Sequence, residues 1–172
     1  SKTNTTKERL RTYNSRNNKK KGNYTMSEQF DPVNKPKQYN KNKCGIETIE
    51  VTRYLGCDLG NAWKYMSRYM FKKKPKEDLE KAVWYLEDFI YNFLYQNDWT
   101  LIPEFSFHVP TLVKEYMQKF IDFEERPEVQ RMFKHILSII NNEGIIDKEL
   151  FDYDLKNLLL YAQTLDGIEI VD

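Results

Sequence analysis

The sequence predicts an all-α fold, a helical bundle of about six helices preceded by a flexible basic N-terminal arm. From Ile46 to about Leu165, apolar residues recur at the spacing of one helix face, except around residues 99–109. No two segments alternate polar and apolar residues as paired strands do. The 172 residues, 40% of them hydrophobic, suffice for one core of ordinary size. We therefore expect one domain, with a helical core at residues 31–98 and a helical extension at residues 99–172.

The arm, residues 1–30, carries eight lysines and arginines against two glutamates in a setting rich in Asn, Ser and Thr. Such a segment buries too little apolar surface to offset the entropy lost on ordering. A solvated tail is the simpler interpretation, and contact with nucleic acid is the alternative. The stretch that follows, "DPVNKPKQYNKNKCG", contains two prolines and is expected to be an extended loop. The net charge of +1 gives no further sign of a nucleic-acid or membrane partner.

The first helix is expected to begin near Ile46 and to end at Gly56, because glycine commonly ends a helix. Asp58 is then a candidate N-cap for a second helix that runs into the lysines before Pro75. The apolar positions expected to face the core are Ile46, Ile49, Val51 and Leu55 in the first helix, and Leu59, Ala62, Trp63, Met66 and Met70 in the second.

The third helix is expected to be the longest, from Pro75 to about Asp98. Proline suits a first helical turn, and Glu77 and Asp78 lie near the positive end of the helix dipole. Its core stripe consists of Leu79, Val83, Leu86, Ile90 and Phe93. Its second aromatic face, formed by Trp84, Tyr91 and Tyr95, indicates either packing on both sides within one chain or a subunit interface.

Three more amphipathic helices are expected at residues 110–123, 127–142 and 147–165. His135 lies next to the apolar stripe of the second of these helices and is interpreted as a structural or surface residue. His108, in the proline-flanked loop before them, gives no better sign of a ligand. The chain has no Walker loop, dinucleotide fingerprint, nucleophile elbow or His-rich metal motif.

With only Cys44 and Cys57, and without an apolar run of about 20 residues or a signal peptide, we expect a soluble cytoplasmic protein with no membrane partner.

One polar stripe stands out in the segment "GNAWKYMSRYMFKKK". Asn61, Lys64, Arg68 and Lys72 lie at helical spacing and are interleaved with aromatic residues. The preceding helix has its own stripe, in which Glu47, Glu50 and Tyr54 share a face. The two stripes are either an interhelical set of salt bridges or a nucleotide site. In a nucleotide site the cations would hold phosphate oxygens and the carboxylates would hold Mg²⁺ or a ribose.

Three stretches, "YNKNKCGIETIEV", "GNAWKYMSRYMFKKK" and "EDLEKAVWYLEDFI", together resemble a small phage-encoded family of the DUF3310 type. Its best-known member is a nucleotide kinase without a Walker loop. The resemblance covers about residues 34–93, and the matching positions are Tyr39, Gly45, Ile46, Glu47, Gly60, Asn61, Lys64, Tyr65, Arg68, Glu77, Asp78, Leu79, Lys81, Ala82, Trp84, Tyr85 and Leu86.

The resemblance implies an α-helical, homo-oligomeric nucleotide-binding protein in the cytoplasm of an infected host. The residues expected to bind nucleotide or phosphate are Tyr39, Glu47, Asn61, Lys64, Arg68 and Lys72, with Glu47 and Glu50 as ligands of a possible Mg²⁺ and no organic cofactor. The enzyme form would transfer a phosphoryl group from a nucleoside triphosphate to a nucleoside monophosphate. Arg68 is expected to be exposed, so that Arg68→Ala weakens nucleotide binding ten- to a hundredfold but hardly affects folding.

Two departures from the family pattern bear on this function. Gln38 stands where members tend to have His, and Gln keeps hydrogen bonding without acid–base chemistry. Tyr69 and Met70 replace a small Ala-Gly pair, which would reshape any pocket they line. A protein that sequesters a nucleotide or a nucleotide-derived immune signal without turnover, as an anti-defence factor, is therefore the alternative. A nucleic-acid-binding protein, suggested by the basic arm and the aromatic helices, is a weaker one.

Overall fold

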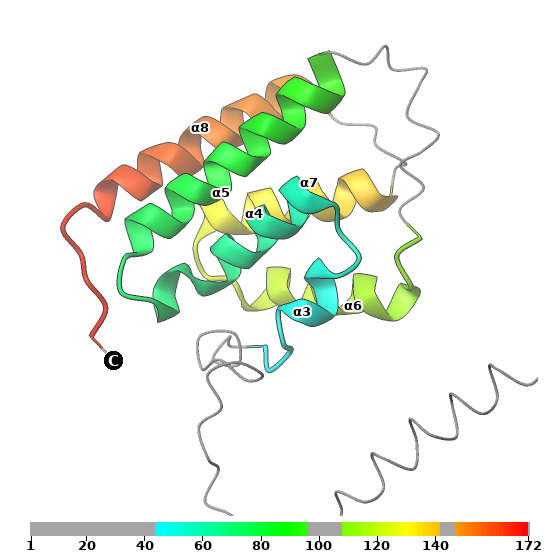
Figure 1. Ribbon diagram of the computed structural model, residues 1–172, viewed down its shortest axis with the longest axis horizontal. Helices are drawn as coiled ribbons and strands as arrows, with labels where there is room; N and C mark the ends of the chain where they lie inside the picture. The colour runs from blue at the N-terminus through cyan, green and yellow to red at the C-terminus, as the bar shows by residue number, and fades with distance from the viewer. Residues whose placement is uncertain (1–43, 96–107, 142–146, 172) are drawn as a thin grey trace, which may run out of the picture. The chain divides into compact units, whose positions relative to one another are not determined.

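The computed structural model describes residues 44–95, 108–141 and 147–171, and these residues form an all-α unit (Figure 1). Six α-helices and two short helices of other types make up the described part of the chain, in which no strand occurs. The predicted all-α class is therefore confirmed. The predictions for the basic arm, for the extended segment with Gln38 and Tyr39, and for most of the 99–109 loop lie outside the described residues.

The first two helices are α3 (Ile49–Thr52) and α4 (Cys57–Arg68). The first helix is shorter than predicted, because it begins at Ile49 and ends at Thr52 instead of running from Ile46 to Gly56. Gly56 is the N-cap of α4, so Asp58 lies in the first turn and is not the cap. The two helices pack closely at Gly60, where an added Cβ would lie only 3.3 Å from the carbonyl oxygen of Thr52. Of the predicted core positions, Ile49 is wrong, because its side chain is exposed.

The second helix ends earlier than predicted. After Arg68 the chain forms a 3₁₀ turn, η1 (Tyr69–Phe71), and Lys72 is extended. The tighter turn changes the side-chain register, so Tyr69 is buried whereas Met70 is 48% exposed. Met70 was therefore wrongly predicted as a core residue.

The third helix, α5 (Pro75–Phe89), begins with proline in its first turn and has Glu77 and Asp78 near its N-terminus, as predicted. It does not continue regularly to Asp98, because Ile90–Tyr95 form a π-helix, η2. There the Asn92 side-chain amide donates to the Asp88 carbonyl oxygen at 3.0 Å and to its carboxylate at 2.9 Å. The predicted core residues of α5 that are described, Leu79, Val83, Leu86 and Ile90, are buried.

The last three helices are α6 (Thr111–Phe123), α7 (Pro127–Asn141) and α8 (Lys148–Thr164), close to the predicted bounds. Helix α8 lies along α5, while α4 packs against α5 and approaches α7 (Figure 1). His135 of α7 hydrogen-bonds through Nε2 to the buried Asp154 carboxylate of α8 at 2.7 Å. This contact gives His135 a structural role, as the sequence predicted.

The centre of the core is aromatic. The buried indole of Trp63 lies 4.3 Å from the ring of Phe133 and 5.5 Å from that of Phe120, measured between centroids. These three rings join α4, α6 and α7. Burial of large aromatic side chains is worth roughly 1.5–3 kcal/mol each, so this cluster fixes α4 against the C-terminal helices.

Candidate functional site

Two residues of the predicted polar stripe, Asn61 and Lys64, are in contact on the surface of α4. Lys64 donates a hydrogen bond from Nζ to Oδ1 of Asn61 at 2.6 Å, and Asn61 donates to the carbonyl oxygen of Cys57 at 2.9 Å. Both side chains are half-buried. Lys72 is exposed and lies beyond the end of the helix. Helical spacing therefore does not place it on the same face as Asn61 and Lys64.

Arg68 differs from the prediction because it is buried, with only 7% of its surface exposed. Its guanidinium forms two bonds with the Asp78 carboxylate of α5, Nη2 to Oδ1 at 2.9 Å and Nε to Oδ2 at 3.1 Å. A two-point contact of this kind neutralises the guanidinium and fixes its plane. The expectation of an exposed Arg68 was therefore wrong, and this side chain joins α4 to α5.

A cation–aromatic face, which we define as Lys64, Tyr65, Lys81, Trp84 and Tyr85, surrounds this ion pair. The ring of Tyr65 has the Nζ atoms of Lys64 and Lys81 at 4.7 and 5.8 Å from its centroid. It stacks on Tyr85 at 5.9 Å, and Tyr85 contacts Trp84 edge-on at 5.0 Å. Trp84 is 58% exposed. Cations and accessible rings thus lie together on the surface of α4 and α5.

Lys64 is the electrostatically unusual residue of this face. Its pKa is lowered, first by partial burial and then by the neighbouring charge of Arg68. Lys81 differs, because its ammonium is paired with Glu77 one helical turn away. Among the described residues, Lys64 forms no salt bridge. An anion placed beside it would relieve both the desolvation and the repulsion.

The acidic stripe of the first helix has a partner within its own segment. Glu50 binds Arg53 of its own segment at 2.9 Å, on the surface. Neither Glu47 nor Glu50 is among the charges that shift the pKa of Lys64. In the described part of the chain, no group of three or more His, Cys, Asp or Glu residues is placed to hold a metal ion. Mg²⁺ binding by Glu47 and Glu50 stays a prediction.

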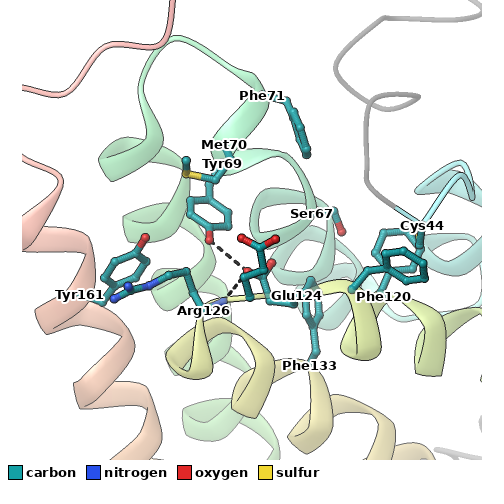
Figure 2. Close-up of a pocket in the computed structure, with 12 residues that line it drawn as sticks. Cys44, Ser67, Tyr69, Met70, Phe71, Phe120, Glu124, Arg126, Phe133 and Tyr161 are labelled. Atoms are coloured by element: carbon teal, nitrogen blue, oxygen red, sulfur yellow. Dashed lines mark hydrogen bonds between the residues drawn. The ribbon is translucent and has the colours of Figure 1, made fainter.

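A pocket of about 300 Å³ lies where the end of α4 meets the C-terminal helices (Figure 2). It is formed by the end of α4 with η1, the end of α6, the turn to α7, and residues of α7 and α8. Its lining includes Tyr69 and Met70, the two bulky residues that were expected to reshape any pocket they line. The lining residues are Cys44, Ser67, Tyr69, Met70, Phe71, Phe120, Phe123, Glu124, Glu125, Arg126, Phe133 and Tyr161.

Polar groups of this pocket converge on Glu124 (Figure 2). Its Oε1 accepts a hydrogen bond from the Tyr69 hydroxyl at 3.2 Å and another from the backbone N–H of Arg126 at 3.0 Å. The guanidinium of Arg126 lies 4.2 Å above the ring of Tyr161. Burial, followed by the Glu124 charge, raises the pKa of Tyr69 far above its ordinary value. Tyr69 is therefore a neutral donor that orients the carboxylate.

Comparison with known proteins gives one match. Residues 33–87 match a family of proteins of unknown function, DUF3310. The match covers about a third of the chain. No curated protein and no solved structure matches the sequence.

The DUF3310-matching segment contains α3, α4, η1 and most of α5, and with them the whole cation–aromatic face. The pocket is different, because the segment supplies Cys44 and residues 67–71 while the remaining walls come from residues 120–161. Sequence reasoning did not find the pocket, since its walls are distant in the chain. Of the helices that the structure describes, none combines the length and apolar character needed to cross a membrane.

Proposed function

We propose that this protein binds a nucleotide or a nucleotide-derived small molecule, with phosphate oxygens held by Asn61, Lys64 and Lys72. The observation that carries the proposal is the state of Lys64. Its ammonium is half-buried, forms no salt bridge among the described residues, and has a pKa that is lowered first by burial. A phosphate oxygen at this position would form a charge-assisted hydrogen bond, worth roughly 1.5–3 kcal/mol.

Two further features support a phosphorylated ligand over a simple inorganic anion. The aromatic rings of Tyr85 and Trp84 continue from the ring that Lys64 covers, so a sugar beside the phosphate has apolar surface to contact. The resemblance to the phage-encoded kinase family also involves this segment. We accordingly include phage origin in the proposal, with Mg²⁺ carried on the nucleotide phosphates and Glu47 and Glu50 as its candidate protein ligands.

Binding without turnover is the form of this function that the geometry favours. Phosphoryl transfer would use Lys64 and Arg68 to stabilise migrating charge. Arg68, however, is engaged on two atoms by Asp78, so its charge is already compensated. A nucleotide-sequestering protein needs only the ground-state contacts, and this is the form we propose first. Kinase activity is the second candidate, supported by the resemblance.

The decisive experiment has two parts. The purified full-length protein is incubated with Mg²⁺, ATP and a panel of nucleoside monophosphates, and products are followed by chromatography while native mass spectrometry detects retained ligand. Retained nucleotide without product supports sequestration, and formation of a diphosphate supports the kinase.

Lys64→Ala tests the site itself. We expect the affinity for tripolyphosphate, measured by calorimetry, to fall about ten- to a hundredfold, because one charge-assisted contact is lost. Lys134→Ala, on the exposed side of α7, is the matched control and is expected to leave the affinity unchanged. Equal affinities for the two variants would exclude Lys64 as a phosphate ligand.

We also propose that the protein is a homo-oligomer that self-associates through the outer face of α5. Trp84 of α5 and Tyr91 of the adjoining η2 are both largely exposed, at 58% and 62%, and large aromatic residues are enriched in interfaces. Light scattering at micromolar concentration should give a multiple of 20.8 kDa, and Tyr91→Glu should shift the mass toward one copy. A monomeric parent protein would rule out this assembly.

A further inference from the structure

The pocket at the end of α4 is separate from the residues assigned above to phosphate binding. We propose that it holds a nucleobase, that is, a planar nitrogen heteroaromatic ring that donates N–H groups to Glu124. This inference deepens the proposed nucleotide-binding function and rests on it, because it states where the base of such a ligand is recognised.

The walls of the pocket favour a flat apolar ligand. Six of its lining residues are aromatic, and three of them, Tyr69, Phe120 and Phe133, are buried. At the rim, Phe123 is 52% exposed and Met70 is 48% exposed. A planar ring that enters would cover both rim side chains and contact aromatic faces inside, which every nucleobase can do.

The volume limits the ligand to a small one. About 300 Å³ is the lower end of the range for small-molecule sites. A pocket of this volume accommodates one ring system with its attached sugar, but it is too small for a protein partner. The two hydrogen bonds at Oε1 hold Glu124 in place before a ligand arrives, so a ring N–H meets a preorganised acceptor.

The charges of the pocket separate the base from the phosphates. Glu124, Glu125 and Arg126 all line it, and the Arg126 guanidinium stacks on the ring of Tyr161, so a phosphate group inside would meet two carboxylates and one cation. Phe71 also lines it, and Lys72, a proposed phosphate contact, follows Phe71 directly in the chain. A base inside the pocket would therefore have its phosphates directed outward.

One buried donor, the indole N–H of Trp63, lies behind the wall of the pocket. The indole N–H of Trp63 is buried and has no hydrogen-bond partner among the described residues. Its ring packs on Phe120 and Phe133, which are both wall residues of the pocket. Buried donors without partners are rare in folded proteins, but Trp63 does not line the pocket, so its N–H is not assigned to the ligand.

Phosphate-free nucleosides provide the test, because they report on the pocket without the lysines. Adenosine, guanosine, cytidine and thymidine are titrated into the full-length protein by calorimetry and by ligand-observed NMR. We expect saturable binding of at least one of them, with upfield shifts of its ring protons from the surrounding aromatic residues.

Two substitutions localise that binding. Phe123→Ala should weaken it about five- to a hundredfold, the usual effect of removing one ring that stacks on a base. Glu124→Gln keeps an acceptor for Tyr69 but loses the charge, and it should weaken binding at least fivefold. Tyr153→Ala and Glu149→Gln, at exposed positions of α8, are the matched controls and should bind nucleosides as the parent protein does.

The outcomes separate this inference from the proposed function. If tripolyphosphate binds through Lys64 while no nucleoside binds, or while nucleosides bind equally to Phe123→Ala and Glu124→Gln, the base pocket is refuted and the phosphate site stands. If nucleosides bind in the pocket but Lys64→Ala has no effect on tripolyphosphate, the base pocket stands and the phosphate site fails.

Discussion

Arg68 illustrates at the residue scale how burial changes the role of a charge. Its two-point contact with Asp78 is removed from solvent on both sides, with the side chains 9% and 5% exposed. We therefore expect Arg68→Ala to lower the free energy of unfolding by about 3–5 kcal/mol, because it leaves the Asp78 carboxylate buried without its partner. Urea unfolding followed by circular dichroism measures this change.

A double variant is the control for this prediction. Arg68→Met combined with Asp78→Leu removes both charges and restores apolar packing, so it should recover most of the lost stability. If Arg68→Ala unfolds at the same urea concentration as the parent protein, the ion pair contributes nothing to the fold. The Lys81–Glu77 pair, on the surface of α5, offers a contrast, and Lys81→Ala should cost less than about 1 kcal/mol.

At this scale the sequence predicted some contacts and missed others. Asn61 and Lys64 lie three positions apart, so helical spacing alone brought them together, and they do hydrogen-bond. The partner of Arg68 is ten residues away on another helix, and nothing in the local spacing distinguishes Asp78 from Glu50 as that partner. The assignment of phosphate binding to Asn61, Lys64 and Lys72 stays a prediction.

At the element scale, two acidic residues interact where the start of α4 packs against the end of α5. Asp58 lies in the first turn of α4, and its pKa is raised above the ordinary 3.8, first by partial burial and then by the charge of Asp88 near the end of α5. Asp88 is also held by the Asn92 amide of the π-helix. A raised folded-state pKa means that the folded protein holds the Asp58 proton more tightly than the unfolded chain does.

This linkage gives a pH-dependent prediction with a definite sign. The contribution of Asp58 to stability is greatest at low pH and is lost as pH rises through its folded pKa, above 3.8. Asp88→Asn keeps an acceptor for Asn92 and removes the repulsion. It should therefore raise the free energy of unfolding at pH 7 by up to about 1 kcal/mol, with a smaller gain at pH 4. An equal gain at both pH values would show that Asp58 and Asp88 do not interact.

The helices themselves were largely predictable, for reasons visible at particular residues. Pro75 and the acidic first turn set the start of α5, and the prolines and apolar stripes of α6 and α7 set theirs. The first helix is shorter than predicted, and two further failures lie where a helix changes type without a proline or glycine. These are the 3₁₀ turn at Tyr69 and the π-helix from Ile90. Helical periodicity does not report such a change, because the adjustment is imposed by tertiary packing.

At the scale of the whole molecule, α8 completes the core of the DUF3310-matching segment. Phe151, Leu155 and Leu158 are buried, and Leu155 lines a groove together with Val83 and Ile90 of α5 and η2. Burial of three such side chains is worth roughly 5–9 kcal/mol, which is comparable with the total stability of a domain. We therefore expect a chain that ends at residue 146 to lose most of its helical circular dichroism signal.

Two leucines of α8 give a matched pair for this prediction. Leu158 is fully buried, whereas Leu160 is 64% exposed on the same helix. Leu158→Ala should cost about 2–5 kcal/mol and Leu160→Ala less than about 0.5 kcal/mol. A helical, cooperatively unfolding truncated chain would show instead that the matching segment folds without α8.

The pocket could not be predicted at any smaller scale, since Tyr69, Phe120, Phe133 and Tyr161 come from four helical segments. Each has an ordinary explanation in its own helix as an apolar residue at a core-facing position. Only their common position in the folded chain distinguishes them. By contrast, the unusual Tyr69–Met70 pair was a usable signal, because bulky residues in place of small ones indicated an altered pocket.

The apolar and the polar residues of that pocket lie in different parts of the fold, and this has a consequence for the evolution of such a protein. Its apolar walls belong to helices whose packing the fold depends on, whereas Glu124, Glu125 and Arg126 occupy the three-residue turn between α6 and α7. Substitutions in a turn are tolerated far better than substitutions in a core. Substitutions at these three adjacent positions can therefore change which ligand the pocket prefers, while the apolar walls keep its shape.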